Sequence, residues 1–201
     1  MFSVRRPTAA SIQARIAAAE RLPEHEPRFL TVEHGSISDR LPPLFAHNFS
    51  SSCIGHGDAT FADAKQAFAR WKMFDLGWVR VANPDAWMVS GQIVAVEVKS
   101  LGLWTVNLSR ILGAIDTPQA FGFIYATTEL HVEEGEERFM LEFDPESGAV
   151  MYKLEAVSRP RSNLARLGFP ITRMFQRRFA RDSHQRMTGS VLHAQTDSLE
   201  A

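Results

Sequence analysis

The chain has 201 residues, of which 45% are hydrophobic and 22% charged, with 12 glycines and 10 prolines. This composition excludes collagen-like, coiled-coil and fully disordered chains and is typical of a globular domain. The 22 Lys and Arg residues balance 23 Asp and Glu residues, so no overall field favours nucleic acid or acidic membranes.

The single cysteine, Cys53, excludes an internal disulfide framework. We expect it to be a small buried hydrophobe rather than a nucleophile, because no catalytic signature flanks it. No stretch approaches the roughly 18 consecutive apolar residues that a membrane-spanning helix needs. These features predict a cytoplasmic protein.

Residues 1–43 are expected to form an N-terminal helix and a connecting arm. Good helix formers over residues 8–22 predict a surface helix with Ile12, Ile16 and Ala19 facing the body. The first 19 residues hold three arginines and no acid, as transit peptides do, but no apolar region or signal-type cleavage site accompanies them. A surface helix is therefore favoured over a targeting segment.

Residues 44–188 are expected to form one domain of antiparallel strands between two helical segments. A weak alternation from Leu44 to Ser51 predicts a strand, and an aromatic stripe predicts a core-facing helix from Phe61 to Phe74. Short intervals between the later strands favour antiparallel meander pairing. These strands are predicted over residues 78–81, 88–98, 103–115, 121–128, 136–143 and 150–157, the last two joined by a hairpin turn at residues 144–148.

The last long helix is predicted from about Asn163 to Met187, and residues 189–201 are expected to form a flexible polar tail. The predicted apolar face of this helix consists of Leu164, Leu167, Ile171, Met174, Phe175 and Phe179.

This element order predicts an α+β fold, in which a curved antiparallel sheet of about seven strands wraps on the long C-terminal helix. The apolar concave face of such a sheet must be covered, and the long helix has enough apolar surface to do so. The order resembles the helix-grip fold of START, pollen-allergen and polyketide-cyclase proteins. That resemblance implies a cavity between sheet and helix.

Several sequence blocks stand out along roughly Thr31 to Met187. They are Gly55-His56-Gly57 ahead of Phe61-Ala62-Asp63-Ala64, residues 71–78, Asn107-Leu108-Ser109-Arg110, residues 121–127, residues 131–139 and Ser158-Arg159-Pro160. Together these blocks resemble the family catalogued as domain of unknown function nineteen-ninety. The resemblance carries over no established catalytic residue.

Strand alternation predicts which side chains face the interior. Arg110 is in phase with Trp104, and Glu137 is in phase with Phe139. A buried charge is costly unless paired, so Arg110 and Glu137 are expected either to form a structural ion pair or to line the polar end of a ligand pocket. The predicted ligand-binding residues are Arg110, Tyr125, Trp104 and Phe123.

His131 and Glu137 are the candidate catalytic residues, because a histidine near a carboxylate can act as a general base. The alternative is that His131 is an ordinary turn residue bonded to the backbone. The seven histidines are scattered, so we expect no metal site and no cofactor.

The C-terminal helix carries many arginines, of which Arg166, Arg173 and Arg177 lie near one face with Arg181 a turn beyond. A phosphate or RNA contact is one interpretation. A solvated face opposite the core is favoured, because exposed aromatic residues do not interleave with these arginines.

Two functional hypotheses follow. The first is a small-molecule-binding protein that holds a hydrophobic ligand in an apolar cavity. The second is an enzyme on the same scaffold, a cyclase, isomerase or hydrolase, with Arg110 stabilising an enolate or oxyanion. We expect neither nucleic-acid binding nor membrane insertion; a homodimer and catalysis itself are left open.

Overall fold

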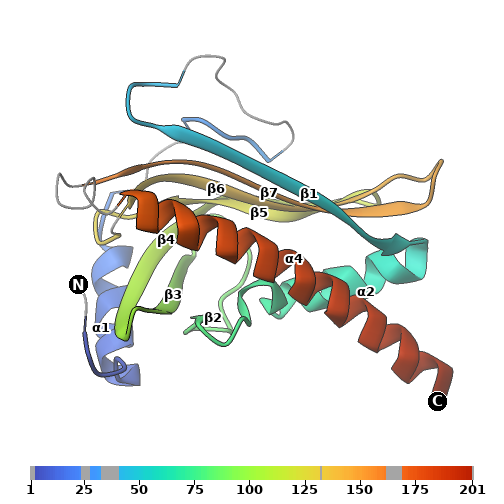
Figure 1. Cartoon of the computed structure of the whole chain (residues 1–201), viewed down its shortest axis with the longest axis horizontal. Coiled ribbons are helices and arrows are strands. Elements are labelled where there is room, and N and C mark those ends of the chain that lie inside the picture. The colour runs from blue at the N-terminus through green and yellow to red at the C-terminus, as the bar shows by residue number, and fades with distance from the viewer. Residues whose placement is uncertain (1–2, 24–27, 33–40, 132, 162–168, 201) are drawn as a thin grey trace.

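The chain folds into one antiparallel sheet with helices on both of its faces (Figure 1). The computed structural model describes residues 3–23, 28–32, 41–131, 133–161 and 169–200. Its elements are α1 (Ala9–Glu20), β1 (Ala46–His56), α2 (Asp58–Ala69), the 3-10 helix η1 (Lys72–Phe74), β2 (Val79–Val81), β3 (Ile93–Ser100), β4 (Leu103–Asp116), β5 (Ala120–Thr127), β6 (Glu133–Phe143), β7 (Ala149–Pro160) and α4 (Phe169–Glu200).

The sheet has seven strands in the order β1-β7-β6-β5-β4-β3-β2. Every neighbouring pair is antiparallel, and β2 to β7 follow one another as a meander. The first strand returns beside the last, so β1 and β2 form the two edges. Cys53 lies on edge strand β1 and is exposed, which corrects the expectation that it is buried. The predicted curved sheet with a long C-terminal helix is confirmed.

The concave face carries the main core, where α2, η1 and α4 cover the sheet. The aromatic stripe of Phe61, Phe68 and Phe74 is buried there, as predicted. The predicted single helix is wrong at one point: Trp71 adopts a left-handed conformation, with φ 58°, which separates α2 from η1. This bend lets the indole of Trp71 and the ring of Phe74 both face the core.

The opposite, convex face is covered too. Helix α1 packs Ile12, Ile16 and Ala19 against a second apolar cluster, as predicted for its buried face. Further along the sheet, Phe29 and Leu30 pack on outward side chains of β5 and β7. The sheet is therefore buried on both faces over much of its area. The outward residues under α1 are Ile93, Ala95, Val106 and Leu108.

This double burial reverses the predicted faces of β4. Val106 and Leu108 pack beneath α1, whereas Thr105, Asn107 and Ser109 line the concave side. Apolar residues identify the inner face of a strand only when its other face is solvated. Both faces of β4 are covered, and its alternating apolar residues lie on the convex face instead of the concave one.

Helix α4 extends beyond the predicted end at Met187 and continues to Glu200. Val191 is only 1% exposed and belongs to the main core, so the predicted flexible tail is wrong for residues 189–200. Phe179 packs on the core as predicted, but Met174 is 55% exposed. Leu164 and Leu167 lie outside the described residues.

None of the helices in the described part of the chain combines the length and apolarity needed to cross a membrane.

Gly135 brings two strands of the sheet unusually close. A Cβ at this position would lie 2.3 Å from the carbonyl oxygen of Val157 and 2.6 Å from Cα of Ser158. Only glycine fits such an approach. Since Gly135 lies midway between Glu133 and Glu137 on β6, this contact fixes the strand where two acidic side chains face inward.

Candidate functional site

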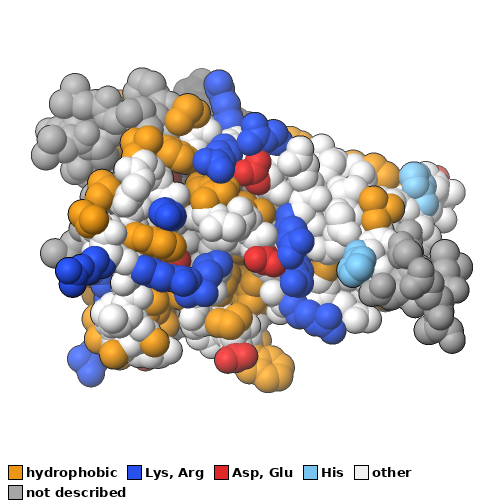
Figure 2. Space-filling model, turned by 60° about the horizontal axis from the view of Figure 1, so that its bottom comes forward, with side chains coloured by type: hydrophobic (Ala, Val, Ile, Leu, Met, Phe, Trp, Pro, Cys, Tyr) orange, Lys and Arg blue, Asp and Glu red, His pale blue; other side chains and the backbone are white. Residues whose placement is uncertain are grey.

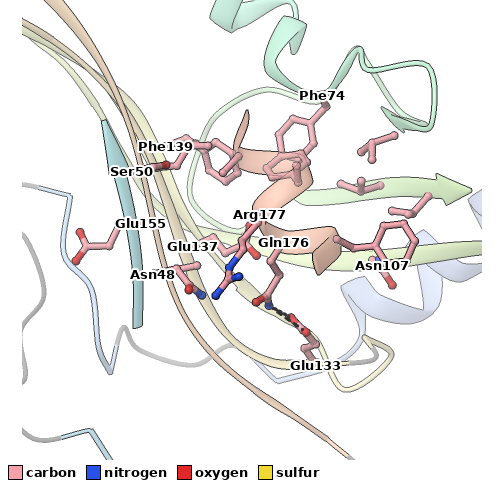
Figure 3. A pocket seen from close by; sticks show the side chains of 18 of the residues that line it. Asn48, Ser50, Phe74, Asn107, Glu133, Glu137, Phe139, Glu155, Gln176 and Arg177 are labelled. Atoms are coloured by element: carbon pink, nitrogen blue, oxygen red, sulfur yellow. Dashed lines mark hydrogen bonds between the residues drawn. The ribbon is translucent and has the colours of Figure 1, made fainter. Parts of the chain in front are cut away.

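A pocket of about 780 Å³ lies between the concave face of the sheet and α4 (Figure 3). Strands β3 to β7 form its floor, β1 forms one wall, and α4 forms the roof. Its apolar lining includes Phe74, Trp78, Val79, Val96, Val98, Phe139, Leu154, Phe175, Phe179 and Ala180.

Tyr125 and Glu137 form a hydrogen-bonded pair in this pocket. They face each other in the register of β5 and β6, and the Tyr125 hydroxyl donates to Oε2 of Glu137 over 2.6 Å. Burial raises the pKa of the Glu137 carboxyl above its ordinary value, although the hydrogen bond from Tyr125 opposes this. Burial and the nearby carboxylate raise the pKa of Tyr125 well above its usual value, so its hydroxyl keeps its proton.

Glu133 is a second carboxyl on the same face of β6, four residues before Glu137. The amide Nε2 of Gln176 donates to both of its oxygens at 3.2 Å, which ties the start of β6 to α4. Burial and repulsion from Glu137 raise the pKa of Glu133 to about 7. The pocket therefore holds two carboxyls that take up protons more readily than ordinary glutamates.

His131 lies in the turn before β6 and also lines the pocket. Its Nδ1 accepts the backbone N–H of Glu133 at 2.9 Å, so the neutral ring carries its proton on Nε2. Burial lowers the pKa of His131 to about 4. With its basic nitrogen engaged, His131 is suited to donate a hydrogen bond and poorly suited to remove a proton.

Two amide side chains facing the pocket are incompletely bonded. Oδ1 of Asn107 and Nδ2 of Asn48 have no hydrogen-bond partner among the described residues. Asn48 and Asn107 come from opposite sides of the pocket, on β1 and β4, as Figure 3 shows. Buried polar atoms are nearly always satisfied, so these two unpaired atoms leave hydrogen-bonding capacity in the side chains that line the pocket.

Arg110 does not reach this pocket. Its side chain lies on the convex face, where its guanidinium donates to the carbonyl oxygens of Ala19 at 2.8 Å and Leu22 at 2.9 Å. The expected proximity of Arg110 to Glu137 is wrong, because residues 106, 108 and 110 face α1. Arg110 thus binds carbonyl groups at and just after the C-terminal end of α1, where the Ala19 carbonyl also accepts the backbone N–H of Leu22 at 3.1 Å.

Trp104 also lies away from the pocket, where the side chains of Arg6 and Lys99 stack on its ring. Phe123 faces the concave side but is fully buried between Phe68, Trp71 and Phe139, so it belongs to the core beneath the pocket. Of the predicted site residues, the structure brings together Tyr125, His131 and Glu137 in the pocket lining.

Sequence reasoning missed several polar residues of the pocket. Glu133 could have been found, because it alternates in phase with Glu137 on β6. Asn107 was hidden by the reversed faces of β4, and Gln176 by the assignment of a solvated face on the last helix. Within the described residues, no group of three His, Cys, Asp or Glu side chains is arranged to hold a metal ion.

Comparison with solved structures identifies the class of fold. The crystal structure of Ara h 8.0201 superposes with a TM-score of 0.50 at 14% sequence identity, covering 74% of this chain and 99% of that chain. The chain is thus a helix-grip protein, with a pocket between its sheet and C-terminal helix. More particularly, it belongs to the family described as Domain of unknown function (DUF1990), which matches residues 31–186. This confirms the resemblance seen in the sequence blocks.

Relatives in the same family cover most of the chain. A UPF0548 protein of Dictyostelium discoideum is 36% identical over 149 residues, covering 69% of this chain and 69% of its own length. A UPF0548 protein of Deinococcus radiodurans is 32% identical over 193 residues, covering 90% of this chain and 94% of its own length.

Proposed function

We propose that the protein binds an apolar small molecule in the pocket beneath α4. The observation that carries this proposal is a cavity of about 780 Å³ with largely apolar walls and a few converging polar groups. Pockets of this size and character are typical of small-molecule sites. Glu133, Glu137 and the unpaired Oδ1 of Asn107 offer hydrogen-bond acceptors to a ligand.

The polar groups of the pocket determine which functional group the ligand must carry. The Tyr125 hydroxyl donates to Glu137 and keeps lone pairs available, while Nε2–H of His131 and Nδ2 of Asn48 supply donors. A ligand hydroxyl, or a carbonyl that can enolise, would satisfy both kinds of group. The rest of the ligand would pack on the aromatic and aliphatic walls.

The second candidate is an enzyme that moves a proton within the bound molecule, as a cyclase or isomerase does. The specific observation in its favour is the raised pKa of Glu133, about 7, beside the protonatable Glu137. General bases work best when their pKa lies near the working pH. In this scheme Glu133 removes the proton and later returns it, while Glu137 in its protonated form donates a hydrogen bond to the developing enolate.

Binding can be tested with Nile red, a neutral apolar dye, and a variant that fills the pocket. We expect Ala180→Trp to abolish dye binding, because Ala180 lines the pocket. Leu192→Trp is the matched control, since Leu192 is an exposed residue on the same helix outside the pocket lining. Absence of dye binding to the wild type, or equal binding to both variants, would overturn the proposal.

The enzymatic candidate has a separate test. Ring opening of 5-nitrobenzisoxazole reports a carboxylate base in an apolar pocket without knowledge of the natural substrate. We expect a rate that rises with pH around a midpoint near 7, as Glu133 loses its proton, and that is lost in Glu133→Gln. A rate unchanged by that substitution would refute the role of Glu133 while leaving ligand binding intact.

A further inference from the structure

A positively charged groove adjoins the pocket, between the β3–β4 hairpin and the first half of α4. Five of its lining residues are cations, and the described lining includes no carboxylate. Figure 2 shows basic side chains gathered across one face of the molecule. The groove is lined by Lys99, Ser100, Leu101, Arg173, Met174, Phe175, Arg177, Arg178 and Arg181.

These cations are only partly neutralised by neighbouring groups. Arg178 and Arg181 share one carboxylate, that of Asp182, at 3.3 and 2.8 Å. No described carboxylate pairs with Lys99 or Arg177, and Arg177 points toward the pocket in Figure 3. The chain as a whole has a net charge of −1, so this excess of positive charge is local to the groove.

The groove borders the pocket. Ser100, Phe175, Arg177 and Arg181 line both spaces, so a molecule seated in the pocket meets the groove at these four residues. Two exposed apolar side chains in the groove lining, Leu101 at 75% and Met174 at 55%, continue the apolar lining outward. A ligand here would meet apolar surface along its body and positive charge at one end.

We propose that the ligand is an amphiphile whose anionic group, a phosphate or carboxylate, is bound by Arg177, Arg181 and Lys99. This inference rests on the proposed function, because the apolar body occupies the same pocket. Arginine guanidinium groups bind phosphate and carboxylate oxygens through paired, charge-assisted hydrogen bonds. The orientation is set by charge, since Glu133 and Glu137 repel an anion that the groove attracts.

The test compares dodecyl phosphate with dodecanol, both below the concentrations at which they aggregate, by displacement of Nile red. We expect dodecyl phosphate to bind at least tenfold more tightly at low ionic strength, with an advantage that shrinks as salt is added. The double variant Arg177→Gln, Arg181→Gln should lose this advantage and bind dodecanol as before. Arg70→Gln is the matched control, because Arg70 is exposed at the end of α2 and outside both spaces.

Each other outcome overturns the inference. Equal affinity for the two ligands, or displacement of the dye by neither, would refute the anionic group and leave the proposed apolar pocket standing on its own dye-binding test. If inorganic phosphate alone competes as well as dodecyl phosphate, the groove is an independent anion site. If the protein sediments with phosphatidylglycerol vesicles but ignores free dodecyl phosphate, it docks on membranes instead.

Discussion

On the convex face of the sheet, Glu136 accepts three backbone N–H groups, from Arg28, Phe29 and Leu30, at 2.7 to 3.0 Å. On the concave face Glu137, the next residue of β6, accepts a hydrogen bond from Tyr125 and faces open space in the pocket. One strand thus carries two neighbouring glutamates in opposite environments. The first is fully bonded within the protein, and the second keeps acceptor capacity for another molecule.

The same contrast holds for other polar groups. On the convex face, Arg110 binds carbonyl groups of α1 and its following turn, and Glu97 pairs with Arg6 and Arg80. On the concave face, amide atoms of Asn48 and Asn107 have no partner among the described residues. Polar groups that complete their bonds internally attach the N-terminal region to the sheet. Those that do not are the ones suited to recognise a ligand.

The largest effect on stability is expected from Glu136→Gln, which disrupts the fully bonded carboxylate on the convex face. The glutamine NH2 group replaces one carboxylate oxygen and cannot accept, so at least one of the three backbone N–H groups loses its partner and the negative charge that strengthens the other bonds is lost. We expect a loss of about 2–4 kcal/mol in the free energy of unfolding, measured by urea denaturation. Glu142→Gln on the same strand, which removes a partly exposed ion pair with Lys153, should change stability by less than about 1 kcal/mol. Similar losses in both variants would contradict the contrast.

A double-mutant cycle on Arg110 and Glu137 tests whether the two faces are independent. Arg110→Ala should cost about 2–4 kcal/mol, because it removes a buried side chain whose charge-assisted hydrogen bonds join the end of α1 to β4. Glu137→Gln should change stability by about 1 kcal/mol or less and weaken ligand binding instead. Since the sheet separates the two side chains, the effects should add to within about 0.5 kcal/mol in the double variant. A coupling above about 1 kcal/mol would place them in contact.

The smallest effect concerns the pH dependence given by Glu133. Its pKa is raised on folding, so the folded state binds the proton more tightly and stability falls as pH rises from about 4.5 through about 7. Glu133→Gln removes this dependence. The variant should therefore gain about 1–2 kcal/mol relative to the wild type between pH 5 and pH 8, allowing for partial solvent exposure of the carboxyl. Thermal melts at both pH values measure it, and parallel shifts of the two proteins would refute the assignment.

Much of the fold could be predicted from the sequence, because local patterns determine it. Hydrophobic periodicity placed α1 and its buried residues Ile12, Ile16 and Ala19, and turn chemistry placed the β6–β7 hairpin. The end of α4 could not be predicted in this way. The helix continues after Gly189 because Val191 packs on the core, and such a tertiary contact leaves little trace in a polar sequence.

The candidate site was harder to predict, because it depends on which helix covers each face of the strands. Tyr125 and Glu137 were assigned correctly to the concave face, since β5 and β6 present aromatic residues there. Arg110 and Trp104 were misplaced, because α1 buries the other face of β4 and makes it equally apolar. Helix α1 is far from β4 in the sequence. The residues of β4 therefore do not indicate that this helix will pack on them.

Gly135 links the backbone of the sheet to the chemistry of the pocket. A methyl group there would push β7 away from β6 at the point midway between the two inward-facing acids. Burial is the main cause of the raised pKa of both acids, so it depends on the closed packing of the strands behind them. A residue with no side chain therefore keeps the sheet closed behind the two acids, and a larger residue at this position would open the sheet to water and return the pKa of both carboxyls toward that of ordinary glutamates.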